Sequence, residues 1–168
     1  MISVGRFFFL AIACILCICC DVGIKRYVFF QVSPLQGVSI FQNWLGVDFS
    51  LEYVKNTGAA WGVFSSLQAY LLWGRCGIIV ALLGSLFFSK APFGRKIAVS
   101  SIAAGAIGNV LDYFIYGHVV DMFHFCFWGY SFAVFNVADS MIFCGVVVLF
   151  LQQAKEQRSK NRADRSRA

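Results

Sequence analysis

The sequence predicts a mainly α-helical, polytopic membrane protein with four transmembrane helices and a small extracytoplasmic β-rich cap. Hydrophobic residues make up 60% of the 168 positions and charged residues only 13%, a composition too apolar for a soluble domain. The mean hydropathy is correspondingly high, at +0.74. Four apolar runs are each long enough to cross a bilayer, which takes about 17–25 residues in a helix.

The expected spans lie at about 4–20, 67–89, 97–116 and 132–151. Four spans place both termini on the same side of the membrane. Ten of the fourteen basic residues also fall on that side, namely Arg6, Lys90, Arg95, Lys96 and six residues after position 154. By the positive-inside rule we expect both termini in the cytoplasm. The chain then divides into one integral membrane domain, residues 1–154, and a basic cytoplasmic tail, residues 155–168.

The first twenty residues have an alternative interpretation as a cleaved signal peptide, because Arg6 precedes a short apolar core. The apolar run continues through Cys20, however, and no polar mature segment follows it. Asp21 and Lys25 are also spaced by one helical turn. We therefore expect a retained first helix.

Neither the net charge nor the cysteines indicate a nucleic-acid partner, a metal site or a disulfide. The charge of +6 owes much to the six basic residues of the tail, which is ordinary for a segment beside a membrane span and gives no reason to expect nucleic acid as a partner. Of the seven cysteines, four lie in the first span on more than one side of a helix, with no histidine nearby. We expect no metal site, no cofactor and no disulfide.

The longest outer segment, residues 27–66, is expected to form the cap. Val47, Phe49, Leu51 and Tyr53 alternate with polar residues, which is the period of a strand with one apolar face. The preceding run, residues 38–45, can pair with it across Gly46. The alternative is a structured loop with no role in binding.

Three aspartates lie where lipid is expected: Asp112, Asp121 and Asp139. An ionisable residue at membrane depth is costly and indicates a functional site. The fourth span returns Asp139 to the outer interface, where either Asp121 or Asp112 could meet it. Two carboxyls in contact share one proton, which suits acid–base hydrolysis of an amide.

Two other interpretations of these aspartates are open. They could only hydrogen-bond between helices, as in a structural or chaperone-like bundle, or they could belong to a small proton- or ion-coupled membrane protein. A relay needs polar groups through the inner half of the bilayer, and the spans offer only a few serines there. This favours chemistry at the outer surface.

Five motifs in order resemble lipoprotein signal peptidase, the bacterial signal peptidase II family. They are Asp21 with Lys25, Asn56-Thr57-Gly58-Ala59-Ala60-Trp61, Gly105-Ala106-Ile107-Gly108-Asn109 followed by Asp112, Gly117-His118-Val119-Val120-Asp121, and Phe135-Asn136-Val137-Ala138-Asp139. The match covers about residues 21–140. One departure is Tyr113, at a position where the family commonly has Arg beside the third-span aspartate.

The resemblance implies an aspartic endopeptidase of the bacterial inner membrane, with its active site near the periplasmic face. It would remove signal peptides from diacylglyceryl-modified prolipoproteins, cleaving before the lipidated cysteine, with membrane lipid as the surrounding partner. The resemblance matches the catalytic pair to Asp121 and Asp139. It matches the residues that support the site or bind substrate to Asp21, Lys25, Asn56, Gly58, Asn109, Asp112 and Asn136.

Overall fold

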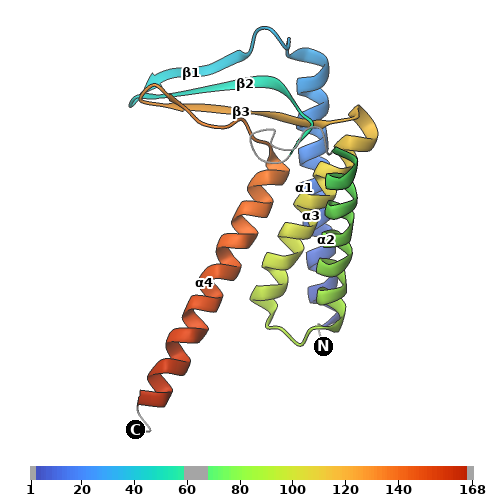
Figure 1. The fold of residues 1–168 in the computed structure, drawn as a ribbon, viewed down its shortest axis with the longest axis vertical. Coiled ribbons are helices and arrows are strands. Elements are labelled where there is room, and N and C mark those ends of the chain that lie inside the picture. The colour runs from blue at the N-terminus through green and yellow to red at the C-terminus, as the bar shows by residue number, and fades with distance from the viewer. Residues whose placement is uncertain (1–2, 59–67, 166–168) are drawn as a thin grey trace.

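The structure, a computed structural model, describes residues 3–58 and 68–165. Along the chain its elements are α1 (Val4–Gln31), β1 (Val38–Trp44), β2 (Val47–Asn56), α2 (Gln68–Phe88), α3 (Phe93–Tyr116), β3 (Val119–Phe127), β4 (Tyr130–Ser131) and α4 (Val137–Arg165). Figure 1 shows the sheet at one end of the four helices, with the last turns of α1 rising beside it. The start of α1 and the end of α4 lie at the opposite end of the helices.

All four helices of the described part are long and apolar enough to span a membrane, which confirms the predicted fold class. Their outward faces carry large apolar side chains, and no residue of α2 is buried. Such exposure is costly in water but is normal for a helix surrounded by lipid. α4 continues to Arg165, so most of the expected basic tail is helical.

Helix α3 lies at the centre of the bundle and contacts each of the other three helices. Small residues allow this close packing: Ala103, Ala104, Gly105 and Gly108 are all buried. A Cβ placed on Gly105 would overlap the carbonyl oxygen of Ala138 in α4. Helices in lipid associate largely through such close backbone contact, because no hydrophobic effect drives them together.

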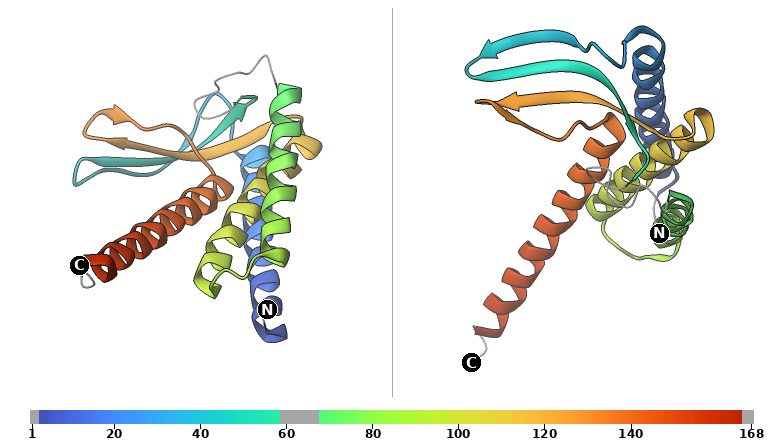
Figure 2. Two further views of the ribbon diagram at one scale, coloured as in Figure 1. Left: turned by 60° about the horizontal axis from the view of Figure 1, so that its bottom comes forward. Right: turned by 45° about the horizontal axis from the view of Figure 1, so that its top comes forward.

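The sheet is antiparallel, with strand order β1-β2-β3-β4, and Figure 2 shows it from two further directions. The predicted pairing of residues 38–45 with the strand after Gly46 is confirmed, since Val38 pairs with Leu51 and Trp44 with Val47. The prediction for the cap omitted β3 and β4, which come from residues 119–131. Both faces of β3 carry apolar residues, so the alternation that revealed β2 is hidden there.

The predicted start of the cap at Tyr27 is wrong, because α1 continues to Gln31. Val28 explains the extension. It is fully buried in a small core with Val32, Tyr53, Val120 and Met122. The last turns of α1 therefore pack against the sheet, and this burial favours continuing the helix beyond the first span.

The two faces of the sheet differ in chemistry. Phe49 of β2 stacks on Phe125 of β3, with ring centroids 4.5 Å apart. Phe125 in turn stacks on Phe135, just before α4, at 6.0 Å. The other face carries polar groups, including His124, whose Nδ1 lies 2.6 Å from Glu52 Oε1. The aromatic face is thus the one nearer the start of α4.

Candidate active site

The chain between β3 and α4 is fixed to β3 by backbone hydrogen bonds. Met122 and Phe123 both donate N–H to the Phe135 carbonyl, at 3.1 and 2.8 Å, and Phe135 donates back to Phe123 at 3.2 Å. Residue 121 of β3 and the first turn of α4 are consequently held next to one another. This brings together Asp121 and Asp139, which lie 18 residues apart in the sequence.

Asn136 caps α4 and forms a reciprocal pair with Asp139. Its side-chain Oδ1 accepts the Asp139 N–H at 2.8 Å, and Asp139 Oδ2 accepts the Asn136 N–H at 3.3 Å. This is the arrangement of a capping box, which satisfies two free amides at a helix start. The positive end of the helix dipole also favours a negative charge at this position. Local helix chemistry therefore fixes the orientation of the Asp139 carboxylate.

The amide groups of two asparagines connect the two aspartates. Asn136 Nδ2 donates to Asp121 Oδ1 at 2.7 Å and also lies 3.2 Å from Asn109 Oδ1. Asn109 Nδ2 donates to Asp139 Oδ1 at 2.8 Å. Each carboxylate thus has an oriented amide donor, and the two donors contact one another.

Asp121 is only 3% exposed. Burial, and then the negative charge of nearby Asp139, raise the pKa of Asp121 to about 7, although hydrogen bonds from Asn56 and Asn136 act in the opposite direction. Asn56 Nδ2 supplies the first of these bonds to Asp121 Oδ2 at 2.9 Å. The pair therefore contains a carboxyl that can hold a proton near neutral pH.

A buried ionic cluster lies beside the two aspartates. Lys25 Nζ is 2.7 Å from Asp21 Oδ2 and 2.7 Å from Asp112 Oδ2, and it donates to Asn109 Oδ1 at 3.2 Å. Asp112 accepts the Val120 N–H at 3.2 Å, and Asp21 accepts the Ala138 N–H at 2.9 Å. These last two amides directly precede Asp121 and Asp139. The cluster therefore positions the backbone on which each aspartate is carried.

A turn after β2 completes the surroundings of Asp121. The Gly58 N–H donates to Asn56 Oδ1 at 3.0 Å, which orients the amide that contacts Asp121. Ala59, Ala60 and Trp61 of the same motif lie outside the described residues. Gly58 thus belongs to the site through its backbone and through Asn56.

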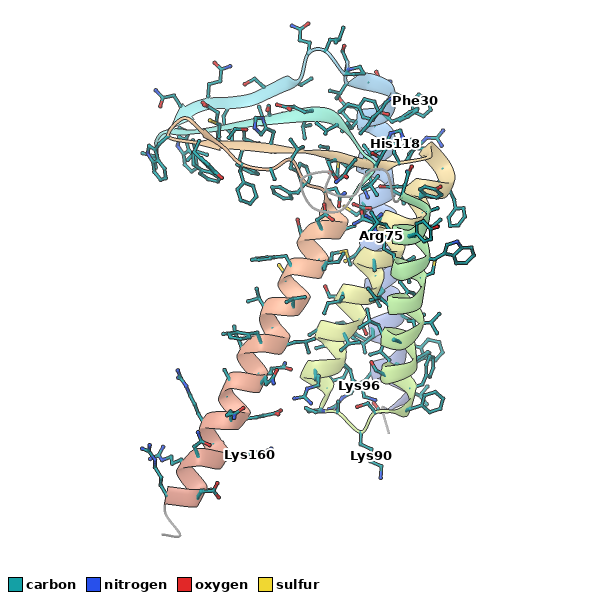
Figure 3. The ribbon with its side chains drawn as sticks, viewed as in Figure 1. Phe30, Arg75, Lys90, Lys96, His118 and Lys160 are labelled. Atoms are coloured by element: carbon teal, nitrogen blue, oxygen red, sulfur yellow. The ribbon has the colours of Figure 1, made fainter. Side chains whose placement is uncertain are left out.

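Arg75 of α2 is a site residue that sequence reasoning missed. Its guanidinium donates to the Gly58 carbonyl at 2.7 Å, so it supports the turn that holds Asn56. Figure 3 places Arg75 near the end of the helices that carries the sheet. A cation inside an otherwise apolar span was the signal that could have identified it.

All nine predicted site residues lie in this one connected network. Asp112, however, contacts Lys25 and the Val120 amide rather than Asp139. The half-buried Tyr113 follows Asp112 in the chain, and Lys25 is the cation beside Asp112. No group of three or more residues within 3–58 and 68–165 has the side chains to hold a metal ion. His118 lies apart, bonded to Tyr53 at 2.8 Å.

Chemically, the network presents two carboxyl groups in unequal surroundings: Asp139 at a helix start, and the buried Asp121 with a raised pKa. Such a pair can activate a water molecule while protonating a carbonyl oxygen. The described side chains that hydrogen-bond to Asp121 and Asp139 are asparagines. A serine–histidine contact, Ser131 Oγ to His124 Nε2 at 2.7 Å, lies with His124 on the polar face of the sheet.

Comparison with known proteins matches this site and fold. Residues 13–155 match the family model described as signal peptidase (SPase) II. The lipoprotein signal peptidase of Chlamydia pneumoniae is 37% identical over 131 residues, covering 74% of this chain and 78% of that protein. That of Streptococcus pneumoniae is 35% identical over 155 residues, covering 90% and 95%. A solved structure of a bacterial membrane enzyme superposes with a TM-score of 0.81 at 24% identity, covering 94% of this chain and 92% of that one.

Proposed function

The chain belongs to the signal peptidase II family, and from that membership we propose that Asp121 and Asp139 are the catalytic pair of a lipoprotein signal peptidase. The observation that carries the assignment is their shared amide scaffold, in which Asn136 donates to Asp121 and Asn109 donates to Asp139. Family membership favours this activity over the small proton- or ion-coupled membrane protein that the aspartates alone would allow.

In the proposed mechanism, Asp139 is the ionised member and Asp121 holds the shared proton. Asp139 takes a proton from water as the water oxygen bonds to the scissile carbonyl carbon. Asp121 gives its proton to the carbonyl oxygen. When the tetrahedral intermediate collapses, the carbon–nitrogen bond breaks, Asp139 protonates the leaving nitrogen, and Asp121 recovers its proton from the hydroxyl. The raised pKa of Asp121 supports this division of roles.

The remaining residues of the site support the pair. Asn56, Asn109 and Asn136 orient the carboxyl groups, and Gly58 orients Asn56. Asp21, Lys25 and Asp112 hold α1, α3, β3 and α4 in register around it. The reaction as proposed uses water as its only co-reactant and takes no metal or cofactor.

The substrate in this proposal is a diacylglyceryl-modified prolipoprotein, cleaved on the N-terminal side of its lipidated cysteine. Its lipid would stay in the outer leaflet while the scissile bond reaches the aspartates, so membrane lipid is a partner and nucleic acid is not. The site lies at the sheet end of four apolar helices, which supports lateral entry from the bilayer.

We place the protein in the bacterial inner membrane, with the site near the periplasmic face and both termini in the cytoplasm. Support comes from the basic residues at the end of the helices opposite the sheet, which include Lys90, Lys96 and Lys160 (Figure 3). Residues 1–154 then form the peptidase domain, and residues 155–168 form a cytoplasmic tail.

The test is prolipoprotein processing by Asp121→Asn and Asp139→Asn, with Asp164→Asn as the matched control because Asp164 is exposed in α4. Asn keeps the shape of Asp but cannot share a proton. Both site variants should lower the processing rate by at least about 10³-fold, the scale lost when one member of a catalytic unit is removed, at unchanged protein abundance. Near wild-type conversion by either variant would overturn the assignment.

A further inference from the structure

A pocket whose lining includes neither Asp121 nor Asp139 lies between α1, α2 and α3. Its volume is about 720 Å³. Apolar side chains make up most of its walls, among them Phe7, Leu10, Leu83, Phe87, Ala104 and Ile107. Phe87 is 69% exposed and Phe7 is 46% exposed, so the pocket is open toward the surrounding lipid.

The lower rim of this pocket carries a buried lysine. Lys96 lines the pocket and is only 6% exposed. Its Nζ donates to the Leu86 carbonyl, near the C-terminal end of α2, at 3.1 Å. Within the described part of the chain, no carboxylate lies within ion-pair distance of the Lys96 ammonium. Glu156 in α4 pairs with the neighbouring Arg95 instead. A buried ammonium with one carbonyl contact retains two donors for an anion.

Lys90 is a second cation at the same rim. It also lines the pocket, and Figure 3 shows it on the loop between α2 and α3, at the same end of the helices as Lys96. The hydroxyl-bearing residues Ser89 and Ser100 are part of the same lining. Positive charge and hydrogen-bond donors are thus gathered at one end of an otherwise apolar pocket.

The length of the pocket fits a lipid chain. Its lining on α1 extends from Val4 to Ile18, which at about 1.5 Å per residue is roughly 21 Å. One leaflet of a bilayer has a hydrocarbon thickness of about 15 Å. An acyl chain lying along α1 would therefore be in contact with protein over the full depth of its leaflet.

We propose that this pocket binds an anionic glycerophospholipid of the adjacent leaflet, with its phosphate at Lys96 and Lys90 and one acyl chain along α1. Basic pockets between transmembrane helices bind such headgroups. A substrate signal helix is the wrong occupant, because its own positively charged end would meet Lys90 and Lys96. The proposal rests on the four membrane-spanning helices and not on the catalytic pair.

The experiment titrates phosphatidylglycerol into the purified full chain in neutral detergent and counts bound lipid by native mass spectrometry. Phosphatidylcholine is the zwitterionic comparison. Lys96→Gln should weaken phosphatidylglycerol binding about fivefold, whereas Lys155→Gln, the same charge loss on an exposed site of α4, should leave it unchanged. Equal binding of the two lipids, or equal effects of the two substitutions, would overturn the proposal.

Two further variants separate the headgroup and chain contributions and guard against misfolding. Lys96→Arg should retain binding, because the charge is kept. Ala11→Phe fills the wall of the pocket on α1 and should weaken binding while leaving both lysines in place. Retained binding in Ala11→Phe would contradict an acyl chain in the pocket. Inorganic phosphate should not displace the lipid at millimolar concentration, and displacement would identify a site for free anions instead.

Discussion

Lys25 and Asp112 form a fully buried ion pair, with Nζ 2.7 Å from Oδ2, which joins the first helix to the third. The same ammonium contacts Asp21 at 2.7 Å, so one cation serves two buried carboxylates. The position after Asp112 carries Tyr113 in this chain. Lys25 therefore has a larger share in balancing Asp112 than it would beside an arginine.

The first prediction concerns Lys25. Lys25→Met should destabilise the protein by about 3–5 kcal/mol, because removing one partner leaves two buried carboxylates without their counter-ion. Thermal unfolding in detergent measures the loss. The matched control is Arg26→Met, which removes the same charge from an exposed neighbour and should change stability by less than about 1 kcal/mol. Equal losses in the two variants would show that the buried pairing is unimportant.

Asn136 gives a second prediction, because it both caps α4 and contacts Asp121. Asn136→Ser keeps a good cap and removes the amide donor, so it should retain most of the stability while lowering processing by about 10²-fold. Asn136→Ala loses both roles and should cost about 1 kcal/mol more. Unfolding midpoints and processing rates, compared side by side, measure the two roles. Full activity in Asn136→Ser would exclude the proposed role of the amide.

Gly105 tests the packing of α3 on α4. Gly105→Ala should destabilise the bundle by about 1–3 kcal/mol and slow processing, because the added methyl overlaps the Ala138 carbonyl next to Asp139. Gly74→Ala in α2 is the control, since a Cβ there has nothing within 4 Å and should be neutral or slightly stabilising. Thermal unfolding of the two variants decides the matter, and an unaffected Gly105→Ala protein would contradict the close approach.

Arg75 supports the turn at Gly58, so Arg75→Gln should lower kcat by about tenfold with a small change in stability, as expected for a residue that positions Asn56 and does not react. Lys55→Gln removes the same charge from an exposed site on β2 and should leave kcat unchanged. Both are measured on a diacylglyceryl peptide. A change confined to KM would indicate that Arg75 contacts substrate instead.

Much of the fold could be predicted because membrane spans and hairpins leave simple patterns. Apolar length identified the four helices, and the alternation after Gly46 identified the pairing of β1 with β2. Strands β3 and β4 left no such pattern, since Val120 and Met122 are buried on one face of β3 while phenylalanines cover the other. The extension of α1 depends on Val28 packing against the sheet, a contact between distant segments.

Part of the candidate site could likewise be predicted from the sequence, and part of it could not. Motif order identified the aspartates, the asparagines and Lys25, and spacing alone could not choose between Asp112 and Asp121 as the neighbour of Asp139. That choice depends on the bonds between Phe123 and Phe135, which align β3 with α4. Arg75 contributes by donating to the backbone carbonyl of Gly58. Every residue type has such a carbonyl, so the contact requires no particular residue at the accepting position.

The last prediction concerns pH. Since burial and Asp139 raise the pKa of Asp121 to about 7, and the proposed reaction needs that proton, kcat/KM should fall as pH rises through about 7. The hydrogen bond from Asn56 lowers the pKa of Asp121 because it stabilises the charged form. Asn56→Leu should therefore move the fall in rate to higher pH, besides lowering the maximum.

His118→Asn is the control. Burial and then Lys55 lower the pKa of His118, so this histidine is already neutral near pH 7. Its removal should leave the position of the fall unchanged. Rates measured from pH 5 to 9 on one lipidated peptide compare the three proteins, and a shift to lower pH in Asn56→Leu would contradict the assignment of the proton to Asp121.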